Sequence, residues 1–224
     1  MALVDTAPIE LTTFGWVPPF ARGQVRDLRV RWALEEIGAD YCVRTVGPVP
    51  PEYFREQPFG QVPAYREGDL QLFESGAIVQ HVGEKDERLL PRDPAPRARA
   101  IQWTYAALNS VEPYVMGYAA LGAFYPDEEW AKLRKPSARA ELSKRLDRVA
   151  DWLGDRQWLE GDRFTIGDLM MVAVLRITGD EGGPVAEHPT LDAYRARGIA
   201  RPAFQRALAD QLALYADKPK GEAA

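Results

Sequence analysis

Two short segments combine residue types that suit the binding of a small peptide, and the first surrounds Pro63. This proline stands at the start of an expected strand, where it cannot donate a hydrogen bond to a neighbouring strand. A turn before it leaves the main-chain N–H and C=O of Val62 free to pair with the backbone of an extended ligand. The alternative is that Pro63 only marks the edge of a strand.

The second segment comes eleven residues after Pro63, where Glu74 and Ser75 open an expected helix. The free N–H groups at the helix start, the positive end of the helix dipole and the Ser75 hydroxyl together suit a carboxylate. Glu74 adds an acceptor for an ammonium group. Ser75 serving only as a helix N-cap is the alternative. Backbone pairing, an anion site and an acidic group together indicate a small zwitterionic peptide as the ligand.

The elements that would position these residues form an α/β N-terminal domain over residues 1–85. Strands are expected at 9–16, 41–46, 62–66 and 70–73, with a helix that begins near Gly23, a short turn-like helix after Pro51 and a helix from Ser75, in the order βαβαββα. The first helix shows one apolar stripe and ends at Gly38. The stripe consists of Val30, Ala33, Leu34 and Ile37.

The rest of the chain is helical in pattern. Residues 86–96 hold prolines among charges and indicate a linker. Helices are then expected at 97–123, interrupted by Pro113, at 127–153, at 166–177 and twice within 190–215. We therefore expect a second, all-α domain over residues 97–224. Thr165 is expected to cap the helix that follows it, with Asp168 reaching back to the Thr165 N–H as a capping box.

These motifs resemble those of the glutathione transferases. The resemblance covers nearly the whole chain and is carried by 60–64 (GQVPA), 72–78 (LFESGAI), 29–36 (RVRWALEE) and 164–169 (FTIGDL). It implies a thioredoxin-like domain followed by a helical domain, glutathione as co-substrate and a homodimer. It further implies that Pro63 is cis, that Val62 pairs with the cysteinyl backbone, that Gln61 touches the glycyl end, and that Glu74 and Ser75 hold the γ-glutamyl group.

The residue that activates the thiol is not evident, because most members place a Tyr, Ser or Cys after the first strand and residues 20–27 contain none of these or Thr. Thr12 and Thr13 lie earlier, on the strand. Extending the helical stripe back one turn brings Arg26 and Asp27 to the inward face. Because buried charges need partners, a purely structural pair of Asp27 with Arg22 or Arg26 is one reading.

The functional reading is that cationic and backbone donors stabilise the thiolate. Arg22 or Arg26 would act together with Gln24 and the helix N-terminus. Lowering a thiol pKa by about two units requires about 2.7 kcal/mol. One charge-assisted hydrogen bond supplies about 1.5–3 kcal/mol, so a guanidinium can take the place of a hydroxyl.

The electrophile would lie between Phe20 and the first long helix of the second domain, with Asn109 as the polar contact. Core packing is the alternative for the other candidates at helical spacing, Trp103, Tyr105 and Met116.

Conjugation of glutathione is the preferred reaction. The only cysteine, Cys42, falls in a strand and is expected to be buried, which disfavours a mixed-disulfide mechanism. The alternatives are a non-catalytic glutathione or ligand carrier, an assembly module like the transferase-like domain of the elongation factor one gamma chain, and a glutathione-dependent peroxidase.

Composition excludes other classes of function. A net charge of −5 argues against nucleic-acid binding. The two histidines have no second His or Cys at ligand spacing, so we assign no metal. A signal peptide and a membrane-length apolar run are both absent from the sequence pattern, so we expect a cytoplasmic protein without a membrane partner.

Overall fold

The computed structural model describes residues 7–179 and 182–216. Their contacts group into two compact units, Leu90–Ala200 and the other described residues, so residues 201–216 join the N-terminal unit. The predicted division into 1–85, 86–96 and 97–224 follows the expected helices and strands, whereas the two units are defined by contacts between residues. The outer ends of those predicted domains, residues 1–6 and 217–224, lie outside the described residues.

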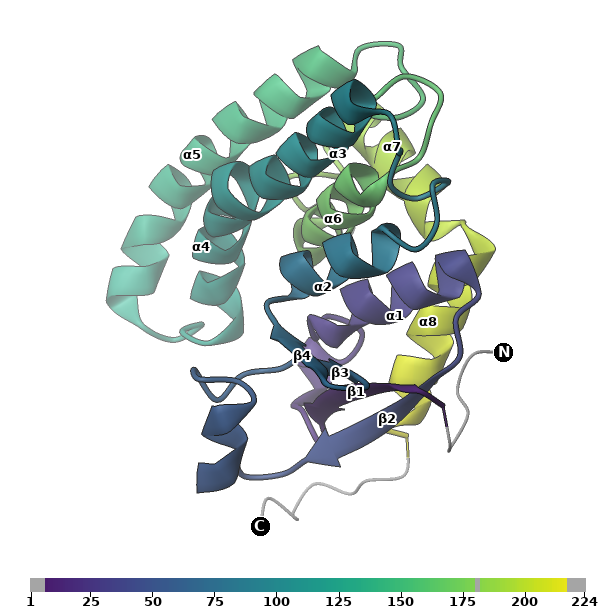
Figure 1. The fold of residues 1–224 in the computed structure, drawn as a ribbon. Coiled ribbons are helices and arrows are strands. Elements are labelled where there is room, and N and C mark those ends of the chain that lie inside the picture. The colour runs from purple at the N-terminus through teal and green to yellow at the C-terminus, as the bar shows by residue number, and fades with distance from the viewer. Residues whose placement is uncertain (1–6, 180–181, 217–224) are drawn as a thin grey trace. The chain divides into compact units, whose positions relative to one another are not determined.

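The first unit is built on a four-stranded mixed sheet. The strands are β1 (Ile9–Phe14), β2 (Tyr41–Val46), β3 (Ala64–Glu67) and β4 (Leu70–Phe73), in the order β2-β1-β3-β4 (Figure 1). β1 runs parallel to β2 and antiparallel to β3, and β3 is antiparallel to β4. This arrangement confirms the predicted thioredoxin-like domain. The third strand begins two residues later than expected, because Pro63 has no N–H for the ladder.

Helix α1 (Asp27–Ile37) connects the two parallel strands, and α2 (Ser75–Gly83) lies beside it (Figure 1). α1 ends at Gly38 in the left-handed conformation, as predicted. It begins four residues later than expected, because residues 22–26 form turns and Gly23 has a φ of 74°. The short helices η1 (Pro19–Ala21) and η2 (Pro51–Arg55) are 3₁₀ helices.

All of the first nine residues of α1 are buried, whereas an amphipathic surface helix buries only one apolar stripe. The reason is α8 (Pro202–Ala213), which packs along α1. Buried Glu35 therefore pairs with Arg206 at 2.6 Å, and Glu36 pairs with Arg201 at 2.6 Å.

The second unit is all-helical, as predicted. Its helices are α3 (Pro94–Ala106), α4 (Glu112–Ala123), α5 (Glu129–Leu153), α6 (Ile166–Leu175) and α7 (Pro189–Ile199), with a π-helical turn η3 (Ala107–Val111) and a 3₁₀ turn η4 (Arg176–Thr178). α3 begins inside the expected linker because Asp93 caps it and Pro94 fits its first position. The π turn precedes Pro113, whose ring is incompatible with an α-helical bond to the preceding turn.

α6 is the centre of the second unit, since all ten of its residues are buried. The predicted capping box is present: Thr165 accepts from the Gly167 N–H, and the Asp168 carboxylate accepts from the Thr165 N–H at 2.9 Å. The same carboxylate accepts from the Leu159 N–H at 2.8 Å and the Tyr194 hydroxyl at 2.9 Å. Asp168 therefore joins the loop before α6 to α7.

Across residues 7–179 and 182–216, none of the helices has both the length and the apolar character of a membrane span.

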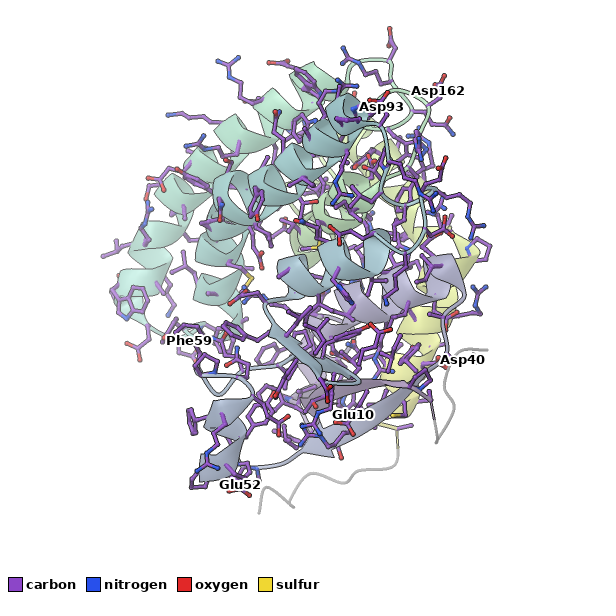
Figure 2. The ribbon with its side chains drawn as sticks, viewed as in Figure 1. Glu10, Asp40, Glu52, Phe59, Asp93 and Asp162 are labelled. Atoms are coloured by element: carbon purple, nitrogen blue, oxygen red, sulfur yellow. The ribbon has the colours of Figure 1, made fainter. Side chains whose placement is uncertain are left out.

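We expect Asp168→Ala to lower the free energy of unfolding by at least about 3 kcal/mol, because Leu159 N–H and Tyr194 O–H would stay buried without an acceptor. Urea unfolding followed by circular dichroism measures this. The matched control is Asp162→Ala, an exposed position in the loop before α6 that is labelled in Figure 2, where a change within about 0.5 kcal/mol is expected. Equal effects of the two substitutions would contradict the role of Asp168.

Candidate functional site

The loop before β3 is held by two buried side chains. The Tyr53 hydroxyl donates to the Gln61 carbonyl at 2.7 Å. The side-chain oxygen of Gln57 accepts from the N–H groups of Phe59 at 2.7 Å and Gln61 at 3.1 Å. Sequence reasoning missed Tyr53 and Gln57, since nothing in their spacing marks them. Gln61 itself is exposed, as is Phe59, which is labelled in Figure 2.

The main chain of Val62 is available for a ligand. The Val62–Pro63 bond is cis, as the resemblance implied. The first ladder position of β3 is Ala64, and in the described part of the chain the N–H and C=O of Val62 make no hydrogen bond. The Val62 side chain is buried in a cluster with Val46, Tyr53 and Ala64, so the backbone is held in place while its polar groups stay unpaired.

The start of α2 lies at the same end of the β3–β4 hairpin. Ala64 pairs with Phe73 in the last pair of the hairpin, so the adjoining residues Pro63 and Glu74 lie at the same end of it. Glu74 has a φ of 68° and provides no side-chain cap. Ser75 is buried, and its hydroxyl oxygen accepts a hydrogen bond from Nη1 of Arg29 at 3.3 Å.

The bond from Arg29 gives the Ser75 hydroxyl a direction. Because its oxygen accepts from the guanidinium, its hydrogen is left for donation to a ligand. Together with the first N–H groups of α2, this hydroxyl suits a carboxylate. Arg29 belongs to the helix segment that carried the resemblance, but the sequence did not connect it with Ser75.

The segment expected to activate a thiol is a series of turns. Nε of Arg22 is buried and has no hydrogen-bond partner among the described residues. Gln24 is half-buried, and its N–H donates to the Ala21 carbonyl at 2.9 Å. Arg26 is exposed, so the expectation that it faces inward is wrong, because residues 22–26 form turns and the regular helix begins only at Asp27.

The expected structural pair of Asp27 with Arg22 or Arg26 is also wrong. Asp27 is fully buried, as expected, but it pairs with Arg31 one helical turn later, at 2.7 Å. Burial raises the pKa of Asp27, although Arg31 opposes the effect. Thr12 and Thr13 are 2% and 0% exposed. Burial raises the pKa values of Asp27 and Tyr215, and the Thr13 hydroxyl opposes the rise in both. Thr13 therefore belongs to a buried polar cluster around Asp27.

The two residues predicted to contact the electrophile lie in different units. Phe20 is 50% exposed in the first unit, and Asn109 is exposed on the π turn of the second unit. Their shared pocket remains a prediction. Cys42 is half-buried rather than buried, and its thiol donates to the Ile9 carbonyl at 3.4 Å. Within residues 7–179 and 182–216, no group of three or more His, Cys, Asp or Glu side chains could hold a metal.

A polar cluster anchors the body of α2 to β3. Glu67 accepts from Lys85 at 2.7 Å and from the Tyr65 hydroxyl at 3.0 Å, and it lies 3.1 Å from Nε2 of His81. Burial raises the pKa of Glu67, but hydrogen bonds from Lys85, His81 and Tyr65 outweigh burial and lower the pKa to about 2.

Comparison with known proteins gives consistent matches along both units. The family model described as the N-terminal domain of glutathione S-transferase matches residues 12–84, and the C-terminal domain model matches residues 113–202. Glutathione S-transferase GstA of Escherichia coli O157:H7 is 35% identical over 156 residues, which are 64% of this chain and 73% of that protein. Glutathione S-transferase PARB of Nicotiana tabacum is 30% identical over 168 residues, with 70% and 77% covered.

Solved structures agree. A glutathione transferase family member from Pseudomonas fluorescens, with two glutathione bound, superposes with a TM-score of 0.79 at 25% identity, covering 92% of this chain and 94% of that one. A glutathione transferase from Burkholderia graminis, with two glutathione molecules bound per subunit, gives 0.78 at 26% identity, with 89% and 87% covered.

Two substitutions test the backbone strain at Glu74. L-residues rarely adopt a φ of 68° with a ψ of 113°, which costs about 1–3 kcal/mol. Glu74→Gly and Glu74→Ala remove the same carboxylate, but only glycine removes the strain. We expect the glycine variant to be more stable than the alanine variant by about 1 kcal/mol in urea unfolding. A more stable alanine variant would contradict the strain.

Glu67 should make the free energy of unfolding depend on pH in the acid range. The Glu67 carboxylate has a folded pKa of about 2, below its ordinary 4.5, so its contribution to stability is complete above pH 4.5 and is lost as the pH falls toward 2. Glu67→Gln should therefore show a flatter dependence of unfolding free energy on pH over this interval. The control is Glu52→Gln, exposed on η2 and labelled in Figure 2, which should keep the wild-type slope. The idea fails if the two variants show the same slope.

Proposed function

The chain belongs to the glutathione S-transferase family, and on that premise we propose that it holds glutathione in its first unit and presents the thiol, as a thiolate, to a small electrophile. The chain is thus a transferase enzyme. Five residues would form the glutathione site: Gln61, Val62, Pro63, Glu74 and Ser75.

The observation that carries the proposal is that the main chain of Val62, which is unpaired among the described residues, lies beside the start of α2. An extended tripeptide can place its cysteinyl N–H and C=O against Val62 and its γ-glutamyl carboxylate at Ser75 and the helix N-terminus. Glu74 would accept from the γ-glutamyl ammonium group, and Gln61 would contact the glycyl end. The site thus meets each charged end of glutathione with an opposite charge or a donor.

For the thiolate we propose donors from the segment that follows β1, namely Arg22, Gln24 and Arg26. Arg22 is favoured, because its Nε is buried and unpaired among the described residues, whereas Arg26 is exposed. Burial matters because a charged donor acts more strongly where water does not screen it. The buried Thr12 and Thr13 are weaker choices, because they lack such a charge.

The proposed reaction is a nucleophilic substitution that uses neither a metal nor a redox partner. The thiol gives its proton to solvent, and the thiolate lone pair forms a carbon–sulfur bond with the electrophile. The leaving group departs with its electron pair. Phe20 and Asn109 remain the proposed contacts of the electrophile. Residues 20–27 contain no cysteine, which favours conjugation over a mixed-disulfide reduction.

The likeness to the family also supports a cytoplasmic homodimer as part of the proposal. The net charge of −5 speaks against a nucleic-acid partner. A non-catalytic carrier is the second candidate function, favoured by the absence of Ser, Thr, Tyr and Cys between residues 20 and 27.

Calorimetric titration with glutathione, followed by the pH dependence of thiolate absorbance in the complex, tests the proposal. We expect saturable binding and a thiol pKa below its value in free glutathione. Binding with an unshifted pKa and no conjugating turnover would indicate the carrier, and an absence of binding would remove the function.

Two variants separate affinity from activation. Ser75→Ala should raise the Kd for glutathione at least about tenfold, because a hydrogen bond to a charged group contributes about 1.5–3 kcal/mol, and should leave the thiol pKa of the complex unchanged. Arg22→Met should raise that pKa by about 1–2 units with little change in Kd. Arg26→Met is the matched control and should have the smaller effect. An unmoved pKa in Arg22→Met would exclude the guanidinium as the activating group.

A further inference from the structure

The side chain of Gln211 connects α8 to the start of α1. This residue of α8 is fully buried. Its Nε2 donates to Oδ1 of Asp27 at 2.6 Å and to the main-chain carbonyl of Val25 at 3.2 Å. The two ion pairs between α8 and α1, from Arg201 and Arg206, hold the helix in the position that these bonds require.

The start of α1 depends on this contact because it has no ordinary cap. The N-cap position is occupied by Arg26, whose side chain makes no capping bond. The residues before it are turns rather than regular structure. The amide of Gln211 therefore fixes a backbone carbonyl and a first-turn carboxylate at this helix start.

Val25 links Gln211 both to the segment that contains Gln24 and to the cluster that contains Val62. It follows Gln24 directly in the chain, and its carbonyl also accepts from the Leu28 N–H at 3.0 Å. Its side chain packs against the cluster that contains Val62. Holding Val25 thus fixes the segment of Arg22 and Gln24 relative to the main chain proposed to bind the cysteinyl residue.

We propose that Gln211 is a positioning residue for thiol activation: by holding Val25 and Asp27 it keeps the donors of residues 22–26 directed at the glutathione sulfur. The inference rests on the proposed function, because it requires that this segment stabilises the thiolate. Gln211 does not touch glutathione in this scheme, so it governs the acidity of the bound thiol and leaves the affinity for glutathione unchanged. Activation tolerates misplacement of only about 0.5 Å.

The principal variant is Gln211→Met, which keeps the length and bulk of the side chain and removes both hydrogen bonds. The expected result is a Kd for glutathione within about twofold of wild type and a bound-thiol pKa raised by about one unit, which is tenfold less thiolate at a pH well below that pKa. Turnover at saturating glutathione should fall by a similar factor at low pH and recover at high pH. A purely structural role would not restore turnover in this way.

A second variant keeps the test open if the methionine variant does not fold. Gln211→Asn retains the amide on a side chain one methylene shorter, and its thiol pKa should lie between those of wild type and the methionine variant. Gln205→Ala, on the exposed side of the same helix, is the control and should match wild type in Kd, pKa and turnover.

The outcomes are distinguishable. A wild-type thiol pKa below that of free glutathione, together with unshifted values in folded Gln211 variants, would overturn the positioning role and leave the proposed function standing. A rise in Kd that accounts for the whole loss of turnover would overturn it as well. An unshifted thiol pKa in the wild-type complex would instead defeat the proposed function.

Discussion

A proline cannot donate a main-chain hydrogen bond, and the proposed glutathione site of this transferase depends on that fact. Pro63 stops the β3 ladder at Ala64, so the polar groups of Val62 have no strand to pair with. The side chain of Val62 is at the same time buried with Tyr53 and Ala64. A fixed backbone unit, unpaired within the described part of the chain, is therefore presented at the end of the β3–β4 hairpin where α2 begins.

Helix α1 connects the parts of the site through its buried charges. Arg29 donates a hydrogen bond to the hydroxyl of Ser75. Asp27 forms an ion pair with Arg31, and Glu35 forms one with Arg206 of α8. Burying any of these charged groups without its partner would lower the stability of the fold, because an unpaired charge loses its hydration. The helix is consequently surrounded, with α2 on one side and α8 on another. Such burial of charge suits a site that must hold donors in place before the ligand arrives.

The absence of a hydroxyl or thiol between residues 20 and 27 shapes the proposed chemistry. A guanidinium provides a full positive charge and several donors, whereas a hydroxyl provides one dipole. A partly buried cation requires support from the surrounding backbone, since the segment that carries it is made of turns. This requirement gives a physical reason for the hydrogen bonds that anchor Val25 and Asp27.

The sequence by itself determined the features that follow from local chemistry. The strands, the end of α1 at Gly38, the capping box of Thr165 and Asp168, and the helix start at Ser75 were all predictable, because periodicity, glycine, proline and capping residues act over a few positions. Only the tertiary structure decided which charges meet. Arg31 rather than Arg26 pairs with Asp27 because it follows Asp27 by one helical turn, whereas Arg26 precedes the first residue of α1. Gln211 reaches Asp27 across 184 positions because α8 packs against α1. Local patterns contain no information on such pairings, since the partners are set by the packing of elements far apart in the chain.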